Sequence, residues 1–498
     1  MGARPSSPLE SSRSGSRHGR RGVLRVRLPQ IAGMASYVPI ALLSDHPGYI
    51  TRGYRLLFLA ALLTILGLIL AQIADHWLKP ETSTRVVGLG LLILLAGGDA
   101  GRANTGRLVV AGAVILAIGA LLVRLEDSRF VAAVFWWLTG FLWLSMVIPY
   151  LLVAISDGGS HIADDQSQQV ALDPGAGDVI IVMFDEFPGG SFAMSSLGVD
   201  MEAAERNLSA RGFETFRDVR VNYAITELAL PSFFMMELPM GANQALSEGD
   251  RNALLGALGG RNAMVRAFDD AGYRVTMVES GWSGLRCMEI VDRCEVRSWY
   301  DEVGWSVARR SVFNGLVASA FGDPFTVGVD RSLTWLEADL PSVAADETPD
   351  LVIVHLMLPH TPIAFNAACG HDPSAGLADQ VACSNRIMLE IAEGTSNAGA
   401  VLMFGDHGTK TLGQLDLPAD TWTQEMVDER MTTFAAVRWP AECGEAGPIS
   451  VTNLAVRLVR CMGATSVRYA ADTSFATSLE SEPLVEVFPR IPRATPSS

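Results

Sequence analysis

Residues 179–186 read VIIVMFDE, a run of six apolar residues that ends in two acidic ones. A short apolar run rich in β-branched residues is typical of a strand that is buried on both faces of a sheet. Comparable runs occur at 351–356 and 400–404, and amphipathic segments with helical spacing, such as 377–393, lie between them. This alternation predicts an α/β domain with a mostly parallel sheet covered by helices on both faces.

The same patterns predict strands at 274–278 and 433–438, and helices at 201–211, 262–271 and 451–462. In such sheets the active site lies at the carboxyl ends of the strands. The chemistry of the domain is therefore sought in the residues that follow each strand.

Acidic and imidazole side chains stand at the carboxyl ends of three predicted strands. They are Asp185 and Glu186 after the first strand, His355 and His360 in and after the second, and Asp406 and His407 after the third. Taken singly, an aspartate at a strand end is more often a helix cap and a histidine more often a core residue. Together they predict a divalent metal site: carboxylates with imidazoles suit Zn²⁺ or Mn²⁺, and carboxylates alone suit Mg²⁺ or Ca²⁺.

Thr226 is the candidate nucleophile. It lies five residues before Pro231, which we expect in the first turn of a helix that continues through 232–238. A hydroxyl near a helix N-terminus meets the positive end of the helix dipole, and a neighbouring metal ion lowers its pKa. The alternative is that Thr226 only caps a helix.

The first third of the chain is apolar. Residues 56–73 read LLFLAALLTILGLILAQI, without a charge, which as a helix is long enough to cross about 30 Å of hydrocarbon. Further apolar runs occur at 86–96, 108–123 and 130–155. We therefore expect an Arg-rich N-terminal segment at 1–55, transmembrane helices within 56–155, a linker at 156–177 and a catalytic domain at 178–498.

The cysteines and charges indicate a compartment and exclude one class of partner. All six cysteines lie beyond residue 280, and proximity pairs Cys287 with Cys294, Cys369 with Cys383, and Cys443 with Cys461. Disulfides are typical of extracytoplasmic domains, whereas the rival reading is buried free thiols. We expect a multi-pass protein of the cell membrane with an extracytoplasmic catalytic domain, although four crossings after a cytoplasmic N-terminus would leave that domain inside. A net charge of −24 over 156–498 argues against a nucleic-acid partner.

The motifs resemble those of the alkaline phosphatase/sulfatase superfamily, in its membrane-anchored branch, over roughly residues 178–476. The best local match is HLMLPH at 355–360 with GDHG at 405–408 downstream. This order and spacing are similar to those of lipid A phosphoethanolamine transferases and lipoteichoic acid synthases, as well as sulfatases. Residues 453–457 and 469–475 resemble the closing segment of the family.

The resemblance implies roles for these residues. Asp185, Thr226, Asp406 and His407 would bind the metal, with Glu186 as a further ligand or a cap. His355 and His360 would hold the substrate's anionic group, protonate the leaving group or bind a second ion, and Lys410 would supply charge to the substrate oxygens. Ala229 and Phe233 stand where arylsulfatases have a Cys or Ser and an Arg, so a formylglycine mechanism is not expected. No histidine follows His407, so a full second metal site is not expected either.

The implied function is cleavage or transfer of a sulfate or phosphate ester group through Thr226. The substrate would be an anionic ester, lipid-linked or glycan-linked, with membrane lipid as a partner. One alternative is a phosphoethanolamine- or phosphoglycerol-type transferase, and another is a non-catalytic envelope protein that retains the fold. The enzymatic reading requires the Thr226 hydroxyl to lie close to the carboxylates of Asp185 and Asp406.

Overall fold

The computed structural model describes part of the chain, and the elements below refer to that part. The described residues are 31, 53–79, 86–87, 162, 170–173, 177–282, 284–296, 305–306, 319–343, 348–441, 443–444, 446–478 and 482–487. The Arg-rich segment 1–55, the apolar runs 86–96, 108–123 and 130–155, and the linker lie wholly or mostly outside them. The chain divides into two compact units, one of 1–156 with 303–321 and one of 157–302 with 322–498.

The first unit contains α3, Gly53–Ala74, which confirms a helix at the predicted apolar segment 56–73. Its described side chains include exposed Leu62, Ile65 and Ile69. A search of the described residues finds no helix with both the length and the apolar character that a membrane crossing requires. The transmembrane block therefore stays a prediction.

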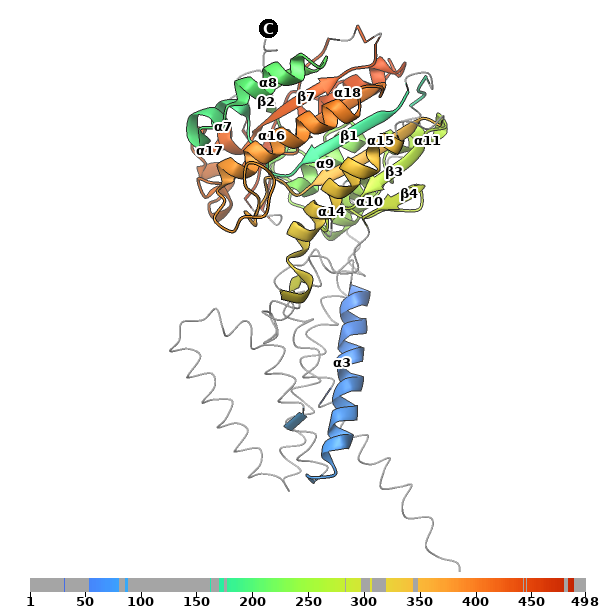
Figure 1. Ribbon diagram of the computed structural model, residues 1–498, viewed down its shortest axis with the longest axis vertical. Helices are drawn as coiled ribbons and strands as arrows, with labels where there is room; N and C mark the ends of the chain where they lie inside the picture. Colours follow the sequence, from blue (N-terminus) through green and yellow to red (C-terminus); the bar gives the residue numbers. More distant parts are fainter. Residues whose placement is uncertain are drawn as a thin grey trace, which may run out of the picture. The chain divides into compact units, whose positions relative to one another are not determined.

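A mixed sheet forms the centre of the second unit. Seven of the described strands pair in the order β2-β7-β6-β1-β5-β3-β4 (Figure 1). Their bounds are β1 Val179–Phe184, β2 Glu214–Arg220, β3 Arg274–Val278, β4 Arg293–Glu295, β5 Asp350–Leu356, β6 Ala400–Gly405 and β7 Thr432–Arg438. The pairs around β1, β3 and β5 are parallel, whereas β7 runs antiparallel to both β6 and β2. The sheet is thus mostly parallel, as predicted, with an antiparallel side that the sequence pattern did not show.

Helices surround this sheet. They are α7 Gly190–Leu197, α8 Met201–Ser209, α9 Thr226–Met235, α10 Glu248–Leu258, α11 Ala263–Asp270, α14 Pro324–Ala338, α15 Leu340–Val343, α16 Leu377–Gly394, α17 Gln424–Arg430 and α18 Val451–Cys461, with short 3₁₀ turns at Gln414–Asp416 and Ala419–Thr421. Four of the helices (α8, α11, α16 and α18) correspond to helices predicted from periodicity. A separate two-stranded sheet joins β8 Phe475–Ala476 to β9 Val485–Glu486.

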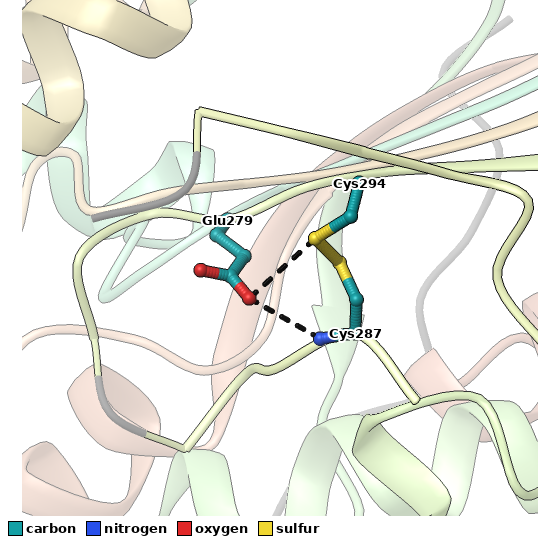
Figure 2. Close-up of side chains that lie close together, drawn as sticks. All are labelled: Glu279, Cys287 and Cys294. Carbon is teal, nitrogen blue, oxygen red and sulfur yellow. Dashed lines mark hydrogen bonds between the residues drawn. A yellow bond between two sulfur atoms is a disulfide. The ribbon is translucent and has the colours of Figure 1, made fainter. Parts of the chain in front are cut away.

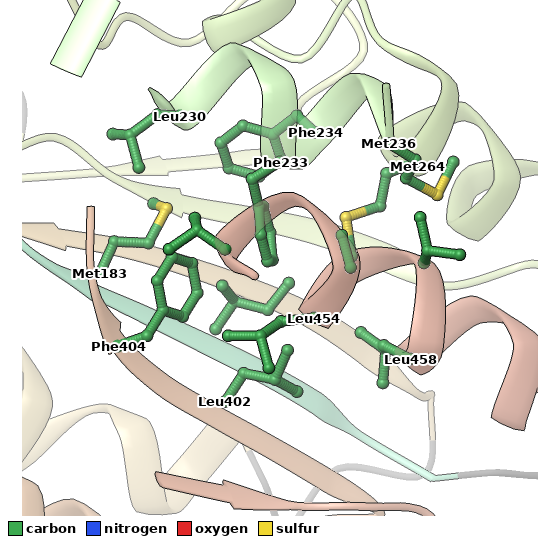
Figure 3. Packing of buried hydrophobic residues seen from close by; sticks show 14 of the residues in the cluster. Met183, Leu230, Phe233, Phe234, Met236, Met264, Leu402, Phe404, Leu454 and Leu458 are labelled. Atoms are coloured by element: carbon green, nitrogen blue, oxygen red, sulfur yellow. The ribbon is translucent and has the colours of Figure 1, made fainter. Parts of the chain in front are cut away.

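Two hydrophobic cores, one on each face, hold these helices to the sheet. Along β1, Ile181 and Met183 join the core that α9, α11 and α18 cover, and Val182 and Phe184 join the core that α8 and α16 cover. Figure 3 shows the first core, in which Phe233 of α9 lies near Phe404 of β6, with ring centroids 4.7 Å apart. Burial of each large apolar side chain contributes about 1.5–3 kcal/mol, so β1 is anchored firmly from both sides.

One local prediction was wrong. The helix expected to start near Pro231 begins at Thr226, and Pro231 lies inside it. Proline removes one backbone hydrogen bond from a helix interior. The burial of Leu230, Phe233 and Phe234 around it offsets that loss. The earlier start makes Thr226 the first residue of α9.

All three predicted disulfides are confirmed. The bonded pairs are Cys287–Cys294, Cys369–Cys383 and Cys443–Cys461. None of the six cysteines lies in β1, β5 or β6, whose ends carry the candidate site: Cys294 is in β4, Cys383 in α16 and Cys461 in α18. We infer that the three bonds stabilise the second unit without entering the candidate site.

Candidate metal centre

The backbone ladder of the sheet brings Asp185 and Asp406 together. Beyond the last residue of β1, the Asp185 N–H donates to the Leu356 carbonyl at 2.9 Å, and the Asp406 N–H donates to the Phe184 carbonyl at 3.1 Å. Parallel pairing therefore continues one residue past the strands. Both carboxylates emerge side by side, and both residues are buried.

These two carboxylates are incompletely paired. Asp406 Oδ1 accepts hydrogen bonds from the N–H groups of Glu186 at 3.1 Å and His407 at 2.7 Å. Asp406 Oδ2 and Asp185 Oδ1 are buried without a hydrogen-bond partner among the described residues. Burial raises the pKa of both carboxyls, and the charge of Glu186 on Asp185, and of Asp185 on Asp406, raises each pKa further. Buried carboxylates in this state are costly unless a cation compensates them.

Three histidines direct their Nε2 atoms toward the acidic side chains of Asp185, Glu186 and Asp406. His407 Nδ1 donates to the Gly408 carbonyl at 3.1 Å, His360 Nδ1 donates to the Thr361 carbonyl, and His355 Nδ1 lies 3.1 Å from Ser280 Oγ. Because these groups contact Nδ1, the opposite ring nitrogen, Nε2, faces the carboxylates. His407 Nε2 lies 3.2 Å from Asp406 Oδ2, and His355 Nε2 lies 3.8 Å from Asp185 Oδ2.

Burial keeps these imidazoles neutral. It lowers the pKa of His355 to about 3 and lowers the pKa of His360 and His407 below the usual range. A neutral imidazole whose Nδ1 is held by another group presents an Nε2 lone pair, which is the form that binds a metal ion.

Thr226 lies next to His407. Its Oγ1 is 3.0 Å from His407 Nε2, and its hydroxyl lowers the pKa of the Asp406 carboxyl against the effect of burial. As the first residue of α9, Thr226 stands where the backbone N–H groups of the first turn are unpaired within the helix. An anion at its oxygen would therefore be stabilised by the helix dipole.

Glu186 lies beside two cationic side chains and the ring of His360. Its backbone adopts a left-handed conformation, with φ of 60°. Glu186 Oε1 lies 2.7 Å from Lys410 Nζ, 3.1 Å from Arg430 Nη1 and 3.9 Å from His360 Nε2. Burial alone would raise the pKa of Glu186, but His360, Arg430 and Lys410 together lower it below its usual range.

Sequence reasoning missed Arg430 and Ser280. Arg430 ends α17 and is buried. It precedes β7 rather than following a strand, and it lies in no motif that the sequence analysis singled out. Ser280 follows β3, and only a systematic survey of every residue after every strand would have found it.

The donor set fits a divalent cation. Two groups have ligand atoms within 4.8 Å of one another: Asp185, Glu186 and His407 form one, and Asp185, His355 and Asp406 form the other. Asp185 belongs to both, and carboxylate oxygens mixed with imidazole nitrogens suit Zn²⁺ or Mn²⁺. The unpaired oxygens of Asp185 and Asp406 are the strongest evidence, because a cation would satisfy them.

A third group of this kind is not a metal site. Glu279 lies beside Cys287 and Cys294, but the two sulfur atoms are bonded to each other (Figure 2). Glu279 Oε1 instead accepts a hydrogen bond from the Cys287 N–H at 3.3 Å. A disulfide offers no thiolate to a metal ion.

Comparisons with known proteins concern the whole chain. No protein-family model matches the sequence, and no curated protein matches it. Among solved structures, the chain is similar to the zinc complex of the C-terminal periplasmic domain of EptC from Escherichia coli. The identity is 11%, the similarity covers 65% of this chain and 94% of that one, and the TM-score is 0.36.

Two further solved structures show likenesses of the same degree. The lipoteichoic acid synthase LtaP from Listeria monocytogenes is 10% identical over 58% of this chain and 76% of its own, with a TM-score of 0.36. The 2-O GAG sulfatase BT1596 is 12% identical over 60% and 77%, also with a TM-score of 0.36. At these values the likenesses assign no activity to this chain. The resemblance of the motifs at 355–360 and 405–408 to the alkaline phosphatase/sulfatase superfamily therefore stays a prediction from the sequence.

Proposed function

We propose that the second unit is a divalent-metal-dependent enzyme that cleaves or transfers a sulfate or phosphate ester group through Thr226. One observation carries this proposal: Thr226 is the first residue of α9, its Oγ1 lies 3.0 Å from His407 Nε2, and its hydroxyl lowers the pKa of Asp406, one of the two incompletely paired carboxylates. A hydroxyl that only capped α9 would not need a buried imidazole and the Asp406 carboxylate beside it.

Asp185, Asp406, His407 and Thr226 would hold the cation, with His355 within reach of the same group. When bound, a divalent ion there supplies Lewis-acid polarisation of an ester oxygen and lowers the pKa of a neighbouring hydroxyl. The carbonyl of Gly408 contributes by fixing the tautomer of His407, so that its Nε2 lone pair faces the centre.

In the reaction, Thr226 Oγ1 forms a bond to phosphorus or sulfur while the bond from that atom to the leaving oxygen breaks. Thr226 gives up its hydroxyl proton, and the leaving oxygen takes one up. Lys410, with a side chain that is 31% exposed, lies at the solvent side of the cluster and would stabilise the negative charge on the transferred group. His360 is also partly exposed and would orient the anionic group or relay a proton from solvent.

A second nucleophile then releases the Thr226 ester. Water makes the protein a hydrolase, whereas a lipid or glycan hydroxyl makes it a transferase of the phosphoethanolamine or phosphoglycerol type. The three disulfides support an extracytoplasmic location for the domain. Together with the predicted transmembrane helices, this favours an envelope ester that is linked to lipid or glycan.

The experiment that tests the proposal is intact-mass analysis of the purified protein after incubation with zinc or manganese and candidate esters. We expect a sulfo-, phospho- or phosphoethanolamine adduct on Thr226, which Thr226→Ala abolishes and Thr226→Ser retains. The size of the adduct identifies the transferred group. Turnover that Thr226→Ala leaves unchanged would exclude Thr226 as the nucleophile. Absence of any turnover, with unfolding on metal removal, would favour the non-catalytic alternative.

A further inference from the structure

The last two residues of α17 carry opposite charges, and both contact the segment that follows β6. Glu429 and Arg430 are 0% and 2% exposed. We propose that they are positioning residues, which fix the segment 407–414 so that His407 and Lys410 face the metal centre. The catalytic consequence rests on the proposed function, whereas the structural consequence does not.

Glu429 holds the distal half of this segment. Its Oε1 accepts hydrogen bonds from Thr409 Oγ1 at 2.7 Å, the Thr411 N–H at 2.6 Å and Thr411 Oγ1 at 2.7 Å. Its Oε2 accepts from the Leu412 N–H at 3.2 Å and from Gln414 Nε2 at 2.5 Å. A buried carboxylate is costly unless donors surround it, and here every one of these donors belongs to the segment. The segment must therefore adopt this conformation for Glu429 to stay buried.

Arg430 holds the proximal half and ties it to two other parts of the centre. Its Nη1 donates to the Gly408 carbonyl at 2.8 Å and to Glu186 Oε1 at 3.1 Å, and its Nε donates to the Ala224 carbonyl at 2.8 Å. Ala224 lies two residues before Thr226. One guanidinium thus connects the segments that carry the nucleophile, the end of β1 and the end of β6.

The Gly408 carbonyl has two donors, Arg430 and His407 Nδ1. By fixing that carbonyl, Arg430 fixes the acceptor that sets the tautomer and ring orientation of His407. Partners of this kind around a metal ligand affect metal affinity even though they do not touch the ion.

The backbone of the segment 407–414 also lies in direct contact with the backbone at the end of α17. The Gly408 N–H donates to the Arg430 carbonyl at 3.0 Å, and a Cβ at Gly408 would lie only 1.8 Å from the Glu429 carbonyl oxygen. Only glycine fits such an approach, so the segment lies directly on the end of α17. Lys410 stands between the two threonines that Glu429 holds, and its Nζ reaches Glu186 from there.

The two residues should therefore have separable effects. Glu429 acts on Lys410 and on the binding of an anion, whereas Arg430 acts on His407 and on the binding of the metal. Glu429→Gln keeps one acceptor oxygen and replaces the other by an NH2 group, which cannot accept from the donors on that side. Arg430→Lys keeps the positive charge but cannot make the three bridging hydrogen bonds.

The structure offers a matched pair of controls. Asp350 and Arg274 form a buried ion pair at the amino ends of β5 and β3, where Arg274 Nε donates to Asp350 Oδ1 at 2.8 Å. Leu356 lies six positions after Asp350, a distance of about 20 Å along β5. Asp350→Asn and Arg274→Lys make the same chemical changes away from the metal centre.

The experiment measures zinc affinity, the affinity of the zinc-loaded protein for inorganic sulfate and phosphate, and amide exchange in 405–414, for all four variants. For Glu429→Gln we expect exchange at 409–414 about tenfold faster and anion binding about tenfold weaker, with zinc affinity within threefold of wild type. For Arg430→Lys we expect zinc affinity to fall about 10–100-fold. The controls should leave both affinities within about threefold of wild type, and any faster exchange in them should be spread over the whole domain rather than confined to 405–414, because their effect is on global stability.

The proposal is overturned if exchange at 409–414 in Glu429→Gln is no faster than in Asp350→Asn, or if Arg430→Lys binds zinc like wild type. If the expected changes occur but no ester modifies Thr226, the proposed function fails and the positioning roles stand. If adducts form on Thr226 at wild-type rates in both variants, the positioning roles fail and the proposed function stands.

Discussion

Buried charged side chains are paired at the amino edge of the central sheet and incompletely paired at its carboxyl edge. At the amino edge, the Asp350 carboxylate accepts from Arg274, and the Asp350 N–H donates to Asp178 Oδ1 at 2.9 Å. At the carboxyl edge of the same strands, Asp185 Oδ1 and His355 Nε2 are equally buried but have no hydrogen-bond partner among the described residues. Paired buried charges stabilise a fold, whereas unpaired ones that face each other indicate a ligand. The difference supports the candidate metal centre at the carboxyl edge without reference to any relative.

The largest effects are expected when one carboxylate at each edge of the sheet is replaced by an amide. Asp406→Asn removes a charged ligand, so we expect zinc affinity to fall by about 100-fold or more. Its metal-free form should be at least as stable as wild type, because the amide keeps the two hydrogen bonds at Oδ1 without the cost of a buried charge. Asp350→Asn should instead cost about 3–5 kcal/mol, since it removes the charge of a buried carboxylate that accepts from Arg274, and should not change zinc binding.

Zinc titration calorimetry and urea unfolding of the metal-free proteins measure both effects. If Asp406→Asn destabilised the metal-free protein as much as Asp350→Asn does, Asp406 would be a structural charge rather than a ligand. The comparison between the edges would then have no functional meaning.

Removal of the metal should have the next largest effect. Binding to the native state alone stabilises a protein by about 2.7 kcal/mol when the free ion is at 100 times its dissociation constant. We therefore expect a chelator to lower the melting temperature of wild type and to leave that of Asp406→Asn nearly unchanged. A melting temperature of wild type that does not respond to chelation would contradict a metal at the carboxyl edge.

Much of this edge was predictable because its residues follow strands. The apolar runs at 179–184, 351–356 and 400–404 gave the strand boundaries almost to the residue, and parallel pairing then places whatever follows them at one edge. Periodicity reports burial but not direction, so the antiparallel β7 was not foreseen. The start of α9 was missed because burial of its residues outweighed the signal of Pro231.

The contacts of Arg430 could not be predicted in this way. It meets Glu186 across 244 residues of sequence and lies in a helix of seven residues with no distinctive pattern. Ionic contacts of this range depend on the finished packing of α17 against the sheet. Local propensity and strand-end position, which revealed Asp185 and Asp406, contain no information about them.

A smaller effect should appear with pH in the metal-free protein. Burial lowers the pKa of His355 to about 3, against an ordinary value near 6.5. The folded state therefore keeps the imidazole neutral while the unfolded state takes up a proton as the pH falls below 6.5. The stability due to neutral His355 is complete above that pH and is lost toward pH 3, at up to about 1.4 kcal/mol per pH unit.

The variant His355→Gln isolates this contribution. It can still hydrogen-bond to Ser280 but has no titrating ring, so its free energy of unfolding should fall less than that of wild type between pH 7 and pH 5. Urea unfolding in the presence of a chelator measures the difference. An equal pH dependence in the two proteins would show that His355 is solvated rather than buried among unpaired groups.

The smallest expected effect tests the comparison within the metal centre itself. Glu186 is close enough to Asp185 and His407 to be a ligand, yet its Oε1 already contacts Lys410 and Arg430. If unpaired charge is what indicates a ligand, Glu186→Gln should weaken zinc binding less than about tenfold, whereas Asp185→Asn should weaken it about 100-fold or more. Zinc titrations of the two variants decide the point, because both substitutions are isosteric and adjacent in sequence. Equal losses would mean that Glu186 binds the ion despite its cationic neighbours, and pairing could then no longer separate ligands from structural charges in this site.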